Sequence, residues 1–224
     1  WWITKAKVGC PTPLARKDNF KPDPQLAAET NLAADYVGSG TDRGHNMPAA
    51  ENQCQGAVVQ DECFYFSNMT PQYHSLNAGD WKSVEVLERQ LAIDNDSVHV
   101  WCGSIGKAKE IGDNKVAVPT QCWKVLYFVK TREWMAFLFN NDTSKPDGIH
   151  NNLVDKKEIE KLQTQLPAES HIKTYSSDYI TKVGLVRNES KVISFGEKNP
   201  TITGLVKGKP DWCLIPSSAG ACKR

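Results

Sequence analysis

The chain has 224 residues, of which 40% are hydrophobic and 24% are charged, an ordinary composition for a folded globular protein. This length is enough to bury a full core, and we expect a single domain over residues 1–224. The 27 lysines and arginines nearly balance the 26 aspartates and glutamates. The resulting net charge of +1 excludes a chain whose overall positive field attracts polyanions, so any affinity for nucleic acid must come from a local patch.

The N-terminal segment, residues 1–41, is rich in proline, alanine and polar residues and shows little periodicity. We predict an extended arm here, with at most short helices such as one over residues 23–34. The chain begins Trp1-Trp2 without an initiator methionine, and no apolar run reaches the ~20 residues that a membrane span needs. These features are typical of a mature or trimmed secreted form.

The chain contains seven cysteines, more than a reduced cytosolic protein usually carries, and none lies in a Cys-x-x-Cys spacing. We therefore expect disulfides and a secreted or periplasmic location. Pairing nearest neighbours would join Cys54 to Cys63, Cys102 to Cys122 and Cys213 to Cys222 and leave Cys10 unpaired, although sequence does not fix connectivity. Cys102 and Cys122 have the best physical case, because both lie in β-like runs that could pair.

The middle of the chain predicts a strand and then a helix. Residues 63–67 are aromatic and favour a β-strand, which Pro71 is expected to end in a turn. From residue 77 to residue 91 apolar side chains recur at helical spacing, and Asn77 or Asp80 is a candidate N-cap for this helix.

The second half of the chain predicts an antiparallel sheet. Three runs favour β-strands: residues 98–102, 118–129 and 134–139. The last two are joined by a polar turn at residues 130–133 and should form a hairpin. A surface helix is expected over residues 155–166, ended by Pro167, with short strands and turns from Ser170 onward.

The most informative motif is Asp42-Arg43-Gly44-His45, followed by Asn68, Asn77 and Glu85. A histidine with two asparagines and a glutamate at short range supplies the residue types of metal-assisted phosphodiester hydrolysis. With residues 35–40 leading into it, this ordered set resembles the DNA/RNA non-specific endonuclease family, whose active site is a ββα-metal (His-Me) finger. The resemblance covers residues 16–89 and implies an α+β fold, with a central antiparallel sheet flanked by helices and the motif core at residues 42–91.

Several motif residues have roles that chemistry and the resemblance together suggest. A neutral imidazole is a competent base near pH 7, and the resemblance implies that His45 is the general base that activates water. Asn77 offers an amide oxygen, a hard ligand suited to magnesium, and the family uses the matching asparagine as its sole protein ligand. Manganese or calcium would also suit such a site. Asn68 is expected to support catalysis, either by orienting the phosphate or by bracing the site.

Glu85 lies eight residues after Asn77, which in a regular helix is an advance of about 12 Å and a rotation of about 80°. Two side chains so far apart cannot both bind one ion. Unless the first helical turn is distorted, we expect Glu85 to act through hydrogen bonds to the water ligands of the metal or to His45. The family's use of the matching glutamate agrees.

Basic residues are the candidates for substrate binding. Arg43 has the planar fork that matches phosphate oxygens, so it is the expected phosphate clamp at the catalytic centre. The resemblance implies an upstream arginine before residues 20–23. Arg16 fits the spacing of the endonuclease G-like branch, with Lys17 as the substitute. Arg89 lies farther along the predicted helix and is either a contact to the nucleic-acid backbone or a plain surface charge.

Each of these residues also has a structural interpretation. An isolated histidine such as His45 is more often structural than catalytic, and an asparagine before a helix, such as Asn77, is often only a cap. The other histidines are structural or surface residues by default, although His74 is near Asn77 in the sequence. The ordered set as a whole favours the catalytic interpretation.

The sequence therefore predicts a magnesium-dependent, sequence-non-specific endonuclease that hydrolyses DNA and RNA to 5′-phosphate products. The alternative is a nucleic-acid-binding or partner-binding module on the same fold with suppressed hydrolysis. DNA and RNA are the expected partners, and no membrane is expected. A homodimer and an inhibitor or immunity protein are both compatible with the family.

Overall fold

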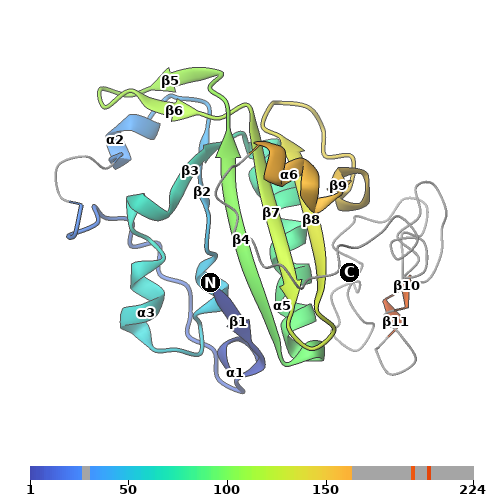
Figure 1. Cartoon of the computed structure of the whole chain (residues 1–224). Helices are drawn as coiled ribbons and strands as arrows, with labels where there is room; N and C mark the ends of the chain where they lie inside the picture. The colour runs from blue at the N-terminus through green and yellow to red at the C-terminus, as the bar shows by residue number, and fades with distance from the viewer. Residues whose placement is uncertain (27–30, 163–192, 195–200, 203–224) are drawn as a thin grey trace.

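The computed structural model describes residues 1–26, 31–162, 193–194 and 201–202 (Figure 1). A five-stranded antiparallel sheet forms its centre, and helices flank this sheet, as the predicted α+β fold requires. The strand order is β1 (Trp2–Thr4), β4 (Ser97–Ile105), β7 (Gln121–Phe128), β8 (Glu133–Asn140) and β9 (Leu153–Val154).

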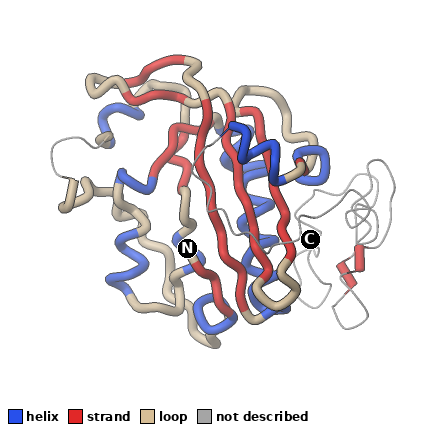
Figure 2. The backbone as a smooth tube through the Cα atoms, in the orientation of Figure 1, coloured by secondary structure: helices blue, strands red, loops and turns tan. Residues whose placement is uncertain are grey.

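The two faces of the sheet follow from the alternation of side chains along β4. Val98 and Val100 are fully buried on the face that packs against the long helix α5 (Lys82–Asn95). His99 and Trp101, which alternate with these valines along β4, point to the opposite face and are only partly buried. In Figure 2 the helix lies behind the strands, so the core lies between the helix and one face of the sheet.

The predicted hairpin is confirmed with one change. β7 and β8 pair from Gln121 opposite Asn140 to Phe128 opposite Glu133. The long run 118–129 divides at Pro119, and its first residue closes a separate strand. That strand, β6 (Val116–Val118), pairs with β5 (Lys109–Ile111) in a small hairpin beside the main sheet.

The helix that was expected from residue 77 is regular only from Lys82 onward. α4 (His74–Leu76) and a π-helical turn, η3 (Asn77–Trp81), come before it, and Gly79 in this turn has non-helical angles (φ −99°, ψ −113°). A Cβ atom at Gly79 would collide with the ring of Pro146. The first turn is therefore distorted because another part of the chain packs against it.

The strand that was expected at residues 63–67 is wrong. The short helix α3 (Ala57–Glu62) leads into this run, which ends in the 3-10 turn η2 (Phe66–Asn68). Phe64 and Phe66 are almost fully buried, so their side chains fill the interior instead of pairing in a ladder. The strand comes later, as β3 (Met69–Gln72), and it includes Pro71.

The N-terminal arm is only partly extended. β1 adds an edge strand to the sheet, α1 (Lys5–Val8) follows it, and α2 (Ala33–Tyr36) lies farther along. The helix expected over residues 23–34 is not formed by the described residues 23–26, and α2 begins only at Ala33. A disulfide between Cys10 and Cys54, with a Cα–Cα distance of 5.8 Å, ties the arm to the body.

This disulfide corrects the nearest-neighbour pairing. Cys10 is bonded rather than unpaired, and Cys63, the expected partner of Cys54, is a free buried thiol. The pair Cys102 and Cys122 is also free.

The register of the sheet explains why these two thiols stay apart. Cys102 lies opposite Lys124, and Cys122 lies opposite Ser104, so the two cysteines are diagonal neighbours. Cα atoms in such diagonal positions are about 7–8 Å apart, which is too far for a disulfide without backbone movement. The third expected pair, Cys213 with Cys222, lies outside the described residues.

The remaining described elements are short. η1 (Ala49–Glu51) follows the motif, and η4 (Ile149–Asn152) precedes β9. The expected surface helix is present as α6 (Lys156–Leu162), whereas its predicted end and most of the tail lie outside the described residues. Two tail segments, β10 (Ile193–Ser194) and β11 (Thr201–Ile202), pair antiparallel. Within the described residues, no helix has the length and apolar character to cross a membrane.

Candidate active site

Two strands and the helix after them carry the motif residues. β2 (Asp42–His45) pairs antiparallel with β3, which places Gly44 opposite Thr70 and His45 opposite Met69. A side chain at Gly44 would collide with the amide of Gln72, so glycine lets the two strands approach here. Together with η3 and α5, which follow them, the two strands form a ββα arrangement. The motif histidine, His45, is the last residue of β2.

His45 is held in an aromatic cage. Its side chain is almost enclosed, with 7% of the residue exposed, and the rings of Phe20 and Phe64 meet it edge-on at 5.7 Å and 5.2 Å between centroids. Trp81 Nε1 donates a hydrogen bond of 3.0 Å to the His45 carbonyl oxygen. The Nε2 atom is buried and has no hydrogen-bond partner among the described residues. The ring is thus fixed, with one nitrogen free to accept a proton.

The environment keeps this imidazole neutral. Burial lowers the pKa of His45 from its ordinary value of 6.5 to about 4, and the positive charge of Arg16 is the next largest cause. Arg43 acts in the same direction, while Asp18 opposes it. At pH 7 the ring is therefore a base with an available lone pair.

For cleavage that uses His45 as the base, this lowered pKa predicts an unusual pH profile. Protonation removes the base, and because the pKa lies near 4, kcat/KM should fall only as the pH approaches that value. Replacing Arg16 with glutamine should move this acidic limb upward, since it removes the largest charge that disfavours the imidazolium. The measurement is kcat/KM against pH at saturating magnesium. A limb near the ordinary ~6.5 in the parent protein would contradict the burial argument.

Asp42 connects the strand to the turn before the helix. Its Oδ2 atom accepts a hydrogen bond of 2.9 Å from Asn77 Nδ2 and another of 2.8 Å from His74 Nδ1. Because the amide nitrogen of Asn77 faces Asp42, its oxygen Oδ1 points elsewhere and remains available as a ligand. Sequence reasoning gave Asp42 no role, since only the folded turn brings it to Asn77.

A cleft of about 550 Å³ opens beside these residues. Its wall includes Asp42, Asn77 and two arginines, Arg16 and Arg43. The Arg43 guanidinium stacks over Phe20 at 3.9 Å from the ring centroid, which fixes the plane of its fork. The structure therefore brings the predicted upstream arginine and the predicted phosphate clamp together at one surface.

Arg16 is also held by a neighbour in the arm. Its Nε atom forms an ion pair of 2.8 Å with Asp18 Oδ1, and its guanidinium lies 5.4 Å from the centroid of the Phe64 ring. Lys17, the predicted substitute, is exposed and does not belong to the cleft wall. Arg89 is half-buried and also lies off this wall, with its Nη1 atom buried and unpaired among the described residues.

Asn68 braces the loop behind the histidine. Its Oδ1 accepts a hydrogen bond from the Met47 amide at 3.0 Å, and its Nδ2 donates to the Met47 and Cys63 carbonyls, each at 2.9 Å. Asn68 also lies at the end of η2, just before β3, and not at the end of a preceding strand. Of its two predicted uses, the contacts match bracing.

Glu85 is half-buried in the first turn of α5. Burial raises its pKa above the ordinary value, and the positive charge of Lys124 acts against that rise. Because η3 is distorted, the regular-helix separation between Asn77 and Glu85 does not apply. The assignment of Glu85 to hydrogen bonds with water ligands or His45 stays a prediction.

A buried ion pair lies close to Glu85. Lys124 Nζ is 2.9 Å from Glu88 Oε1, and both side chains are 0% exposed. The same ammonium lies 4.6 Å from the centroid of the Trp81 ring, whose indole nitrogen binds the His45 carbonyl. The sheet, the helix and the histidine are therefore connected by direct contacts. Sequence analysis missed this lysine, because a charge in a strand usually faces solvent.

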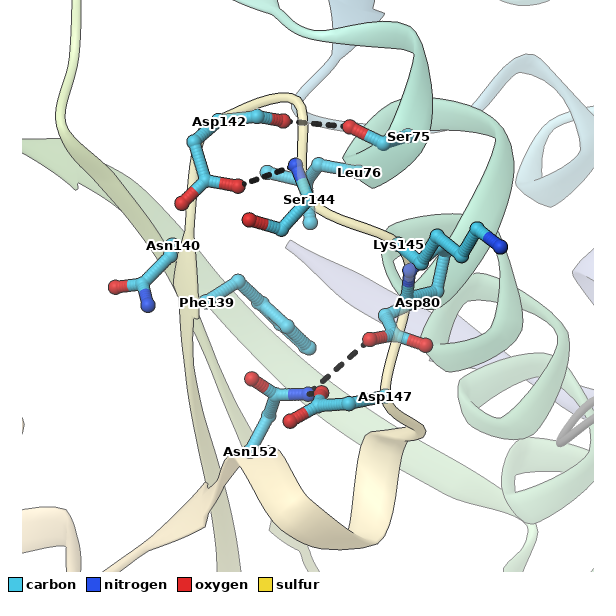
Figure 3. A pocket seen from close by; sticks show the side chains of 11 residues that line it. Ser75, Leu76, Asp80, Phe139, Asn140, Asp142, Ser144, Lys145, Asp147 and Asn152 are labelled. Atoms are coloured by element: carbon cyan, nitrogen blue, oxygen red, sulfur yellow. Dashed lines mark hydrogen bonds between the residues drawn. The ribbon is translucent and has the colours of Figure 1, made fainter.

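A second pocket, of about 130 Å³, lies on the other side of η3 (Figure 3). Figure 3 shows Asp80 and Asn152 pointing toward each other, and Asn152 Nδ2 donates to Asp80 Oδ2 at 3.2 Å. Ser75 Oγ donates to the Asp142 carbonyl at the opposite rim. These contacts anchor residues 141–152 against the turn that carries Asn77.

The donor atoms of the cleft suit a hard divalent cation. Asn77 and Asp42 both line the cleft and bring an amide oxygen and a carboxylate to it, and oxygen donors are what magnesium prefers. Among the described residues, no group of three or more histidine, cysteine, aspartate or glutamate side chains is arranged to hold a metal.

The fold and the site together define a ββα unit with a buried histidine beside an antiparallel sheet, and comparisons with known proteins identify the family. A family model described as DNA/RNA non-specific endonuclease matches residues 1–174. The chain belongs to this DNA/RNA non-specific endonuclease family.

Individual relatives match over parts of their length. "Endonuclease G, mitochondrial" of Homo sapiens is 38% identical over 124 residues, which cover 50% of this chain and 41% of the relative. "Nuclease" of Serratia marcescens is 34% identical over 165 residues, covering 67% and 61%. A crystal structure of an EndoG/EndoGI complex, described as showing the mechanism of EndoG inhibition, matches with a TM-score of 0.69 and 26% identity over 77% of this chain and 80% of that chain. The chain spans 32% of the length of "Nuclease EXOG, mitochondrial" of Mus musculus.

Proposed function

We propose that this protein is a magnesium-dependent, sequence-non-specific endonuclease that hydrolyses DNA and RNA to 5′-phosphate products. The observation that carries this proposal is the neutral imidazole of His45, whose buried Nε2 has no hydrogen-bond partner among the described residues. Its ring contacts Phe20, which lines the same cleft as Arg16, Arg43 and Asn77. Membership in the family supports it.

Each residue contributes one physical task. His45 takes a proton from the attacking water through its free nitrogen. Arg43, with its guanidinium plane fixed by Phe20, binds phosphate oxygens, and Arg16 extends the positive surface along the cleft. Asn77 Oδ1 would hold the metal, which when bound supplies charge stabilisation at the phosphate.

The charge distribution supports broad substrates. The net charge of the chain is only +1, and the cleft wall holds Asp18 and Asp42 as well as its two arginines. The arginines would therefore bind phosphate by local contacts and not through a general positive field. Contacts to phosphate position the backbone without reading the base sequence. An enzyme that recognises its substrate in this way cuts DNA and RNA alike.

The disulfide bears on the location of the protein, and one matched structure bears on its partners. The Cys10–Cys54 disulfide favours an oxidising compartment, so we propose a secreted or periplasmic protein, although several relatives are named as mitochondrial. The matched EndoG/EndoGI structure is described as showing the mechanism of EndoG inhibition, which supports our proposal of an inhibitor or immunity protein as a partner. A homodimer also stays a proposal.

The metal site is tested by replacing its proposed ligand. Asn77→Ala should raise the magnesium concentration for half-maximal cleavage by about 10-fold to 100-fold, because the ion loses its anchor, and excess magnesium should partly restore the rate. Cleavage of plasmid and RNA is measured across a magnesium titration. The exposed Asn140 at the end of β8 provides the matched control, and Asn140→Ala should leave the titration unchanged.

Two results would count against the proposal. An unchanged titration for Asn77→Ala would remove Asn77 from the metal site. Salt-sensitive binding of nucleic acid by the parent protein, without cleavage at any magnesium concentration, would identify a binding module instead.

A further inference from the structure

One histidine outside the motif makes a direct contact with the proposed metal site. His74 is the first residue of α4, and its side chain is 80% exposed. Its Nδ1 atom lies 2.8 Å from Asp42 Oδ2, the same oxygen that accepts the hydrogen bond from Asn77 Nδ2 at 2.9 Å. Two donors from one turn therefore converge on a single carboxylate oxygen.

The chemistry of the three groups fixes the direction of both bonds. A carboxylate can only accept, so the Nδ1 atom of His74 must carry a hydrogen whichever charge the ring has. The amide of Asn77 must likewise present its NH₂ group to Asp42. An asparagine amide has almost the same shape after a half-turn, and this bond is what distinguishes its two orientations.

The orientation of Asn77 decides whether it can bind a cation. With Nδ2 on Asp42, the oxygen Oδ1 faces away and can act as a ligand. After a half-turn the NH₂ group, which has no lone pair to offer, would take that place. The position of the Asp42 carboxylate therefore controls the proposed ligand.

Asp42 needs a second contact to hold that position. Its side chain is 34% exposed, so water competes for its oxygens and the carboxylate can rotate. His74 restrains it from the same turn that carries Asn77. An exposed pair of this kind adds little to folding stability, so its main consequence is the orientation of the groups around it.

We propose that His74 is a positioning residue of the metal site, which acts through Asp42 to keep the Asn77 oxygen directed at the cation. This inference rests on the proposed function, because it takes Asn77 as the metal ligand. It predicts that loss of the His74 hydrogen bond weakens metal binding itself and leaves the chemical step intact once metal is saturating.

The test measures Mn²⁺ binding directly, by the electron paramagnetic resonance signal of the free ion, on the folded full chain without nucleic acid. His74→Ala should raise the dissociation constant for Mn²⁺ by about 10-fold, which is the lower end of the usual loss of metal affinity when a residue that supports a metal ligand is removed. His74→Gln, which can still donate to Asp42, should recover most of this loss. Asn140→Ala, at an exposed position at the end of β8, is the control and should bind as the parent does.

A cleavage assay on the same variants separates binding from chemistry. At saturating metal, His74→Ala should cleave with a kcat close to that of the parent. A dissociation constant within about twofold of the parent, an equal loss in Asn140→Ala, or a His74→Gln variant as weak as alanine would each overturn the role of His74. Asn77→Ala is the reference for the proposed function. If it retains full Mn²⁺ binding, the metal assignment itself fails, whatever the His74 variants do.

Discussion

Replacing His45 with alanine should lower kcat/KM for both DNA and RNA by about 10²-fold to 10⁴-fold, the usual contribution of a positioned general base. The physical reason is that the buried imidazole is neutral and its Nε2 has no hydrogen-bond partner among the described residues, so it can accept a proton, whereas alanine has no proton acceptor. Initial rates on a supercoiled plasmid and on a structured RNA, at saturating magnesium, measure the effect.

A second histidine provides the control for this experiment. His99 stacks on Trp2 at 4.4 Å and on Trp101 at 3.9 Å between ring centroids, on the face of the sheet away from α5. His99→Phe keeps a ring in that stack and should cleave as the parent does. Full activity in a folded His45→Ala variant, confirmed by circular dichroism, would remove His45 from the mechanism.

Replacing Lys124 with methionine should lower the free energy of unfolding by about 3–5 kcal/mol, because the Glu88 carboxylate is left buried without its cation. Burial raises the pKa of the neighbouring Glu51 carboxyl, and the charge of Glu88 raises it further, so a second carboxyl group belongs to this buried cluster. Urea unfolding at neutral pH measures the change. The cleavage rate should fall as well, since Lys124 packs against Trp81.

An ion pair on the surface provides the control for the buried pair of Lys124 and Glu88. Lys107 and Glu110 form an ion pair of 2.8 Å, but their side chains are 58% and 41% exposed. Lys107→Met should therefore have little effect on the free energy of unfolding, because water already solvates both charges. The double change Lys124→Met with Glu88→Leu should recover much of the stability, because it removes the buried charge together with its partner. A single Lys124→Met variant as stable as the parent would contradict the account of the buried pair.

Helical spacing predicted the helix that carries Glu85, which is regular as α5. No local pattern predicted the strands β2 and β3, and the ββα unit that they form with α5 was implied only by the resemblance to the family. The buried positions of α5, such as Val84 and Leu91, also follow helical spacing. The antiparallel sheet was predictable for the same reason, because alternation along each strand specifies its buried face.

Long-range contacts account for what sequence analysis missed. Cys10 and Cys54 are 44 residues apart, and no local signal favours that pair over Cys54 and Cys63. The distorted turn at Gly79 depends on the packing of Pro146, which no periodicity reveals.

The aromatic run at residues 63–67 shows the limit of β-propensity. Its rings have the composition of a strand, yet Phe64 encloses the imidazole of His45 together with Phe20, which lies far upstream in the arm. Burial around the histidine outweighed the local preference for an extended ladder. The same limit hid the hydrogen bonds that meet on Asp42, since they join a strand to a turn about thirty residues later.

The most direct test of the central claim is an analysis of the product ends after the parent protein has cut DNA and RNA. Attack by a water that His45 activates should leave 5′-phosphate ends on both substrates when magnesium is present, and chelation of the metal should stop cleavage. Cleavage of RNA through its own 2′-hydroxyl would leave 5′-hydroxyl ends and would spare DNA. Ends of that kind, or cleavage that continues in the presence of a chelator, would contradict the proposed mechanism.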